Sequence, residues 1–306
     1  MEAIAFASAY YIKLGRAGAF EADAIASGKL RFGWSGQTVA DINAGRWDHI
    51  EQQLRAEHQG KPHGVATTDL NALRLIVKSA ADDVWVTFHQ AKMWWARSAG
   101  PVEEDGTSKF RRTAAPWSDR AATGRLLVAS ELPGKLAQLQ GFRGTVCRVQ
   151  YADLLARVLS GTRSPLAAAI SDQLAALSAH LAAAIRELHW KDFETLVDLV
   201  FRAAGWVRIG VLGQQAKGYD LELREPITGD RYVVQVKSRA GVADLLTAAA
   251  NFAADDYRRV FFVVHTPDGD LAAADAPAHV EVVPPGRLAV LAVQAGLAGW
   301  IEDKVA

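Results

Sequence analysis

The chain has 306 residues, half of them apolar, and its acidic and basic side chains balance to a formal net charge of zero. Its single cysteine, Cys147, excludes a disulfide framework and a zinc site built from cysteines, and it favours the cytoplasm. We identify no apolar run of transmembrane length and no signal-peptide pattern. We therefore expect a soluble protein without a membrane partner, long enough for two domains.

The charged residues are unevenly distributed along the chain. Residues 1–185 carry more Lys and Arg than Asp and Glu, whereas the remainder carries fewer. Because a basic surface attracts the phosphate backbone of nucleic acids, this distribution of charge favours the N-terminal half as the main DNA-binding surface.

The N-terminal region alternates short β-type runs with helical segments. Strands are expected at Ala9–Leu14, Lys29–Trp34, Asp82–Phe88, Lys92–Arg97, Arg125–Ser130 and Gly144–Gln150, and helices at Ala19–Ser27, Val39–Gln53 and Asp69–Ser79. The polar stretch Pro101–Asp119 is typical of a long loop. These elements predict a small α+β domain over residues 1–160, with a curved sheet or barrel and a helical insert.

Aromatic side chains are concentrated in this region, since most of the nine tryptophans precede residue 120. Strand alternation points Trp94 and Trp95 to opposite faces. One of them, with Trp34 or Phe88, would form a pocket on which a base stacks, although core filling explains each tryptophan taken alone. The basic residues expected to contact DNA are Arg16, Lys109, Arg111 and Arg112.

The C-terminal region predicts helices packed over a mixed sheet. An Ala-rich helix, Leu166–Leu188, is expected to connect the domains over residues 161–187. Residues 188–306 then predict a helix at Lys191–Ala204, strands at Trp206–Leu212, Tyr219–Arg224 and Arg231–Ser238, a helix at Val242–Ala254, strands at Arg258–His265 and His279–Val283, and helices from about Arg287 and over Leu297–Lys304. The expected fold class is therefore α/β for this domain, with a three-layer α/β/α core, beside the α+β N-terminal domain.

Four side chains of the C-terminal region suit metal-dependent chemistry. The two-residue period of Arg231–Ser238 places Gln235 and Lys237 on one face, beside Asp220 of the neighbouring strand. A hard divalent cation takes oxygen ligands, which Asp220, Gln235 and Glu194 of the preceding helix can supply. Lys237 would orient or deprotonate a metal-bound water and stabilise charge on phosphorus. Each residue also has an interpretation without a catalytic site. Asp220 would be a turn residue, Lys237 a solvated charge at a strand end, and Glu194 part of the solvated face of an amphipathic helix.

Three pieces of this region resemble, in order and spacing, the PD-(D/E)XK nuclease superfamily. They are Asp192-Phe193-Glu194, Gly218-Tyr219-Asp220 and Gln235-Val236-Lys237. The resemblance runs from about Leu188 to His265 and is strongest to the Mrr-type restriction endonuclease branch, in which a glutamine occupies the second acidic position. The sequence departs from that branch at Lys217, where a glycine-richer loop is usual.

This resemblance implies a restriction-endonuclease-like fold and a role in restricting foreign DNA such as phage DNA. It implies Glu194, Asp220, Gln235 and Lys237 as catalytic residues, and it implies Mg²⁺, or alternatively Mn²⁺, bound by Glu194, Asp220 and Gln235.

The N-terminal region is similar to the PUA-like fold family, which includes the EVE domains that read modified bases. The residues behind this similarity are Tyr10-Tyr11-Ile12-Lys13, Arg31-Phe32-Gly33-Trp34 and Asp83-Val84-Trp85-Val86. The similarity implies recognition of an altered base by the N-terminal domain.

We therefore expect a modification-dependent, type IV-like restriction endonuclease that cuts double-stranded DNA as a homodimer, because a subunit with one site cuts one strand. One alternative is a nucleic-acid-binding module with a degenerate nuclease fold, which would not cleave DNA. Another is a defence nuclease effector activated by a small-molecule signal, which would require that ligand on unmodified DNA.

Overall fold

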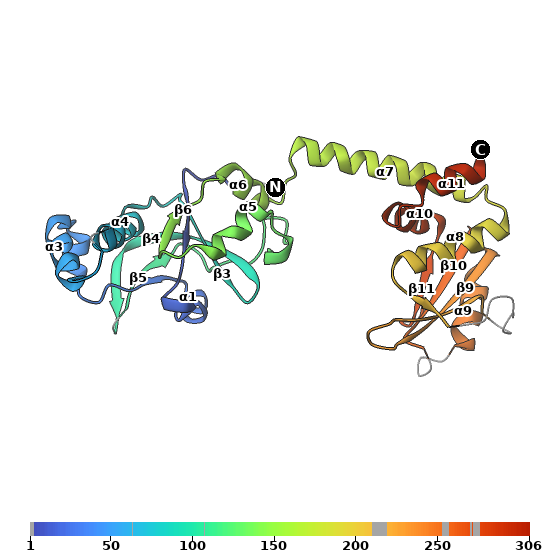
Figure 1. Cartoon of the computed structure of the whole chain (residues 1–306), viewed down its shortest axis with the longest axis horizontal. Helices are drawn as coiled ribbons and strands as arrows, with labels where there is room; N and C mark the ends of the chain where they lie inside the picture. Colours follow the sequence, from blue (N-terminus) through green and yellow to red (C-terminus); the bar gives the residue numbers. More distant parts are fainter. Residues whose placement is uncertain are drawn as a thin grey trace. The chain divides into compact units, whose positions relative to one another are not determined.

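The computed structural model describes residues 3–62, 64–106, 108–209, 219–252, 257–269, 271 and 276–306. The chain divides into two compact units, Met1–Pro165 (unit 1) and Leu166–Ala306 (unit 2), which are coloured blue to green and green to red in Figure 1.

Unit 1 is built on a mixed sheet that has, within the described residues, the strand order β2-β5-β4-β3-β1-β6. The strands are β1 (Ala9–Ile12), β2 (Lys29–Phe32), β3 (Val84–His89), β4 (Lys92–Asp105), β5 (Ser108–Thr113) and β6 (Val146–Arg148). The helices are α1 (Glu21–Ser27), α2 (Val39–Asn43), α3 (Trp47–Glu57), α4 (Gly64–Lys78), α5 (Gly134–Ala137) and α6 (Ala152–Ser160). β1 and β3 pair in parallel and the other neighbours are antiparallel.

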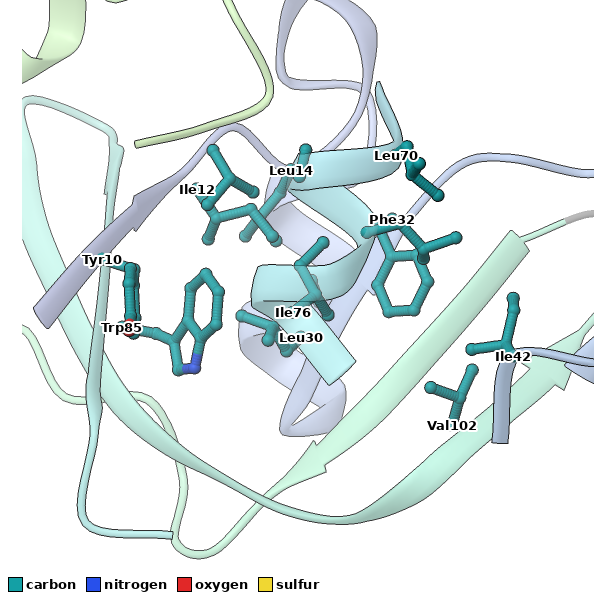
Figure 2. Close-up of a cluster of buried hydrophobic side chains, with 14 of the residues drawn as sticks. Tyr10, Ile12, Leu14, Leu30, Phe32, Ile42, Leu70, Ile76, Trp85 and Val102 are labelled. Carbon is teal, nitrogen blue, oxygen red and sulfur yellow. The ribbon is translucent and has the colours of Figure 1, made fainter. Parts of the chain in front are cut away.

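The sheet of unit 1 has a hydrophobic core on each face, because successive side chains of a strand point to opposite sides. Tyr10 and Ile12 of β1 join one core with residues of α4, while Tyr11 joins the other with residues of α6. Figure 2 shows the first core, in which the rings of Tyr10 and the fully buried Trp85 lie 5.0 Å apart between centroids.

Three expectations for unit 1 were wrong. The helix expected over Val39–Gln53 is broken into α2 and α3, because Gly45 adopts φ 67° after the end of α2. The loop expected at Pro101–Asp119 instead contains the end of β4 and all of β5. In place of the strand expected at Arg125–Ser130 there are isolated bridges and a short 3-10 turn.

Unit 2 contains a second mixed sheet, with the order β11-β10-β9-β8-β7 among the described residues. Its strands are β7 (Val207–Arg208), β8 (Leu221–Arg224), β9 (Arg231–Ala240), β10 (Arg259–Pro267) and β11 (Val280–Val283). The helices α7 (Pro165–Ile185), α8 (Trp190–Ala203), α10 (Pro285–Gln294) and α11 (Ala298–Val305) share one hydrophobic core with one face of this sheet, and α9 (Val242–Asn251) packs on the other face. This is the expected three-layer arrangement, and it is visible around β9 and β10 in Figure 1.

The sheet of unit 2 changes direction at β9. β7, β8 and β9 run antiparallel, whereas β9, β10 and β11 run parallel. β9 therefore lies in the middle of the sheet, between the hairpin partner β8 and the buried strand β10. The expected continuation of β7 to Leu212 and the turn before Tyr219 lie outside the described residues.

Helix α7 qualifies the expectation that no apolar run reaches transmembrane length. By length and composition alone, its 21 residues are sufficient to cross a membrane, with a mean hydropathy of 1.3 over the most apolar stretch. One such helix is weak evidence for a membrane span, and 17 % of this stretch is buried within the structure. The C-terminal end of α7 supplies Leu181 and Ile185 to the core of unit 2.

Candidate active site

Helix α8 brings Glu194 to the sheet of unit 2. Its apolar face is buried in the core through Phe193, Leu196, Val197, Val200 and Phe201. Phe193 packs edge-on against the ring of His265, with 4.9 Å between the ring centroids. Because Glu194 directly follows the buried Phe193, α8 holds this exposed carboxylate on the side of the sheet opposite to α9.

Asp220 is anchored to the backbone of β9. Its own N–H donates to the carbonyl of Val234 at 3.1 Å, next to the register pair Leu221 and Val234. Its carboxylate Oδ2 accepts a hydrogen bond from the N–H of Val236 at 2.6 Å. Val236 lies between Gln235 and Lys237, so the Asp220 carboxylate is held beside the expected catalytic segment.

Gln235 and Lys237 lie on the face of β9 that is covered by α9. They pair in register with Phe262 and Val264 of β10, which belong to the core on that face together with Val233. Gln235 is only 8 % exposed, and its side-chain carbonyl oxygen Oε1 is buried with no hydrogen-bond partner in the described part of the chain. Leaving a buried acceptor without a hydrogen bond destabilises the folded state by about 1–3 kcal/mol. A cation bound to this carbonyl oxygen would offset that loss.

The two carboxylates of the site repel each other. The pKa of Glu194 is raised from its ordinary value by desolvation and by the negative charge of Asp220, and Lys191 offsets part of this increase. Among the described residues, no three His, Cys, Asp or Glu side chains form a metal-binding group. The buried carbonyl oxygen of Gln235, on the α9 side of the sheet, would be a further oxygen donor, and carboxylate and carbonyl oxygens are the ligands that a hard divalent cation takes.

A second polar cluster lies beside Asp220 in the sequence and is centred on Glu222 of β8. Glu222 is buried and accepts hydrogen bonds from the hydroxyl of Tyr219 at 3.0 Å and from Nε of Arg231 at 2.9 Å. Burial raises the pKa of Tyr219, and its bond to Glu222 raises it further. Alternation along β8 indicated that Glu222 shares a face with Asp220, but it did not reveal that Glu222 bonds to Tyr219 and Arg231.

Comparison with known protein families locates the site within a recognised domain. Residues 185–283 match the family model Mrr_cat, described as restriction endonuclease. The match supports a catalytic domain of the restriction endonuclease type in this part of the chain. The matched segment contains Glu194, Asp220, Gln235 and Lys237, and such a domain indicates a nuclease with DNA as its substrate. No curated protein and no solved structure matches the chain.

In unit 1, outside the matched segment, the aromatic residues expected in one pocket are separated. Trp34 and Arg16 line a pocket of about 500 Å³, while Trp95 lines a different pocket of about 540 Å³. Phe88 is buried in the core on the α6 side. Trp94 packs on the opposite side and donates its indole N–H to the carbonyl of His89 at 3.2 Å.

Two of the basic residues expected to contact DNA instead stabilise the fold. The ammonium group of Lys109 donates to the carbonyl of Trp34 at 2.8 Å, and this side chain is 3 % exposed. Arg111 is buried, which lowers its pKa, and its guanidinium donates to the carbonyls of Gly100, Ile76 and Ser79. Both side chains are buried against these carbonyls, so neither presents its charge at the surface where DNA would bind.

Arg112 differs because its side chain is exposed and forms a two-point ion pair with Glu103, at 2.8 Å for each contact. That pairing raises the pKa of the guanidinium. A phosphate would have to displace Glu103 to reach Arg112. Of the four basic residues expected to contact DNA, only Arg16 both lines a pocket and forms no side-chain hydrogen bond or salt bridge with the described residues.

Proposed function

We propose that the chain is a modification-dependent, type IV-like endonuclease that hydrolyses DNA phosphodiester bonds with a divalent metal ion, Mg²⁺ or alternatively Mn²⁺. The unpaired carbonyl oxygen of Gln235 is the observation that supports metal binding most directly. With the carboxylates of Asp220 and Glu194, it would supply the oxygen ligands that such an ion takes. When bound, the ion polarises a phosphoryl oxygen and lowers the pKa of a coordinated water.

Lys237 supplies the positive charge of the proposed site. It lies two residues after Gln235 on β9, so both side chains share one face of the strand. An ammonium group there would stabilise the negative charge that develops on the phosphoryl oxygens, and it would orient the attacking water. The hydrogen bond from Val236 N–H to Asp220 keeps the carboxylate in place before substrate arrives.

The dependence on modification is assigned to unit 1. This unit has its own sheet and cores, and it has a pocket that combines aromatic with basic side chains. Such a combination suits a base that has been flipped out of the duplex. Because one active site cuts one strand, we propose that two copies of the chain act together on double-stranded DNA.

The proposal is tested by digesting matched DNAs, unmodified and carrying different base modifications, with Mg²⁺, with Mn²⁺ and with EDTA. We expect metal-dependent cleavage of one class of modified DNA only. Cleavage of every DNA would retain the nuclease and refute the dependence on modification. No cleavage under any condition would favour a degenerate nuclease fold, and cleavage of unmodified DNA that requires a small molecule would favour a ligand-activated effector.

A further inference from the structure

The pocket of about 500 Å³ in unit 1 is formed by four segments that are distant in sequence. They are the turn after β1, which includes the 3-10 helix Arg16–Gly18, the end of β2 with the residues that follow it, Asp69 of α4, and the loop before β6. Its volume lies in the range of about 300–1,000 Å³ that is typical of small-molecule sites.

The pocket carries a net positive charge, since three cations and one carboxylate line it. Lys13, Arg16 and Arg143 line it, and none of the three forms a salt bridge or a side-chain hydrogen bond with another described residue. The acidic residue in the lining is Asp69, which is already paired with His58 at 2.8 Å. Three cations without partners around one cavity favour an anionic group, and a phosphate is the common one.

The pocket also has an aromatic wall. Trp34 lies beside Phe32, with 6.0 Å between the ring centroids, and Phe20 contributes a half-buried ring from the turn after β1. Phe32 is fully buried, so it supports Trp34 from behind and belongs to the core shown in Figure 2. A planar base can stack on such a wall whatever its sequence, because every base has an aromatic face.

The backbone of Trp34 is held in an uncommon conformation. Its φ is 64°, in the left-handed region that bulky residues rarely adopt. The buried ammonium group of Lys109 donates to its carbonyl at 2.8 Å and secures this turn. Backbone strain that the surrounding structure maintains is concentrated at functional sites. In this pocket the strained residue is Trp34, which forms the aromatic wall.

We propose that this pocket binds a nucleotide, with its base against Trp34 and Phe20 and its phosphate among Lys13, Arg16 and Arg143. The nucleotide has two sources: a modified nucleotide flipped out of DNA, or a free nucleotide that acts as a signal. Binding of a nucleotide in this pocket does not depend on the proposed function. The assignment of that binding to control of the nuclease does rest on it.

The test measures binding by the full-length chain in EDTA, so that no cleavage occurs. The probes are short fluorescent duplexes that are unmodified or contain 5-methylcytosine, 5-hydroxymethylcytosine or 6-methyladenine, and the corresponding free nucleoside monophosphates. Trp34→Ala and Arg143→Glu alter the pocket. Arg125→Ala and Arg125→Glu, at an exposed arginine outside the pocket, are the matched controls.

We expect Trp34→Ala and Arg143→Glu to weaken binding of one probe at least about fivefold, since stacking and charge both contribute, while the two controls bind like the wild type. Preference for a modified duplex identifies DNA as the source, and binding of the free nucleotide alone identifies a signal. Arg143→Glu changes only an exposed side chain, so it remains informative if Trp34→Ala does not fold.

Equal binding by the pocket variants and the controls overturns the proposal, as does the absence of binding of every probe by the wild type. Because the assay needs no catalysis, such a failure leaves the nuclease proposal intact. Conversely, binding with the expected variant pattern but without any metal-dependent cleavage would retain the pocket and refute the nuclease.

Discussion

At the scale of one residue, the Glu194 carboxylate of the candidate site is in an electrostatically unfavourable environment. Its pKa is raised because its carboxyl group is partly desolvated and because Asp220 is negatively charged. Asp220 cannot move away, since its carboxylate is fixed by the N–H of Val236. A divalent cation between the two carboxylates would remove the repulsion, so the same charges that destabilise the metal-free protein favour metal binding.

The raised pKa of Glu194 predicts a pH-dependent effect of Glu194→Gln. Below the ordinary value of 4.5 the carboxyl group is protonated in folded and unfolded chains, so the variant and the wild type should have equal stability. As the pH rises from that value through the raised folded pKa, the unfolded chain releases its proton first and the wild type loses stability. We therefore expect Glu194→Gln to have the larger free energy of unfolding at neutral pH.

This prediction is checked by urea unfolding in EDTA over a pH series, with Glu302→Gln at an exposed position of α11 as the control. A stability difference that does not change with pH would contradict the assigned cause. Addition of Mg²⁺ should stabilise the wild type more than Glu194→Gln, because the variant lacks one of the proposed ligands.

At the scale of secondary structure, periodicity predicted the elements of unit 2 well, because their apolar residues recur regularly. The alternation of Arg231–Ser238 placed Gln235 and Lys237 on one face, and β9 has this arrangement. The polar residues of unit 1 were misleading. Lys109 and Arg111 were assigned to a loop, since a buried cation bonded to backbone carbonyls has the same sequence signature as a solvated one.

The packing of α8 predicts the consequence of Phe193→Ala. Phe193 is 1 % exposed and contacts His265, so its removal leaves a cavity beneath the helix. We expect a loss of about 3–5 kcal/mol in the free energy of unfolding, measured by chemical denaturation. Thr195→Ala, on the exposed face of the same helix, should change stability much less. Equal losses in the two variants would show that α8 does not depend on this contact.

At the scale of the whole molecule, each unit has its own sheet and its own hydrophobic cores. The cores of unit 1 contain residues of unit 1 only, and the same holds for unit 2 among the described residues. Neither unit therefore needs the other to bury its apolar surface. This organisation is consistent with the proposed division into a DNA-recognition unit, unit 1, and a nuclease unit, unit 2.

Separate cores predict that fragments 1–165 and 166–306 each fold alone and unfold cooperatively, as measured by circular dichroism during heating. We expect fragment 166–306 to cut DNA with Mg²⁺ but to have lost the preference for modified DNA. An unfolded fragment 166–306, or one that keeps the preference, would contradict the assignment of recognition to unit 1.

The central claim is that the site on β8, β9 and α8 cuts DNA with a divalent metal ion, and Lys237 tests it most directly. The measurement is the rate of DNA cleavage in Mg²⁺ by the wild type, Lys237→Ala and Ser238→Ala, with DNA binding followed in EDTA. Ser238 is the exposed neighbour on the opposite face of β9. We predict that Lys237→Ala lowers the rate by about 100-fold or more with binding retained, while Ser238→Ala behaves like the wild type. Cleavage in EDTA, or equal rates for the wild type and Lys237→Ala, would contradict the account.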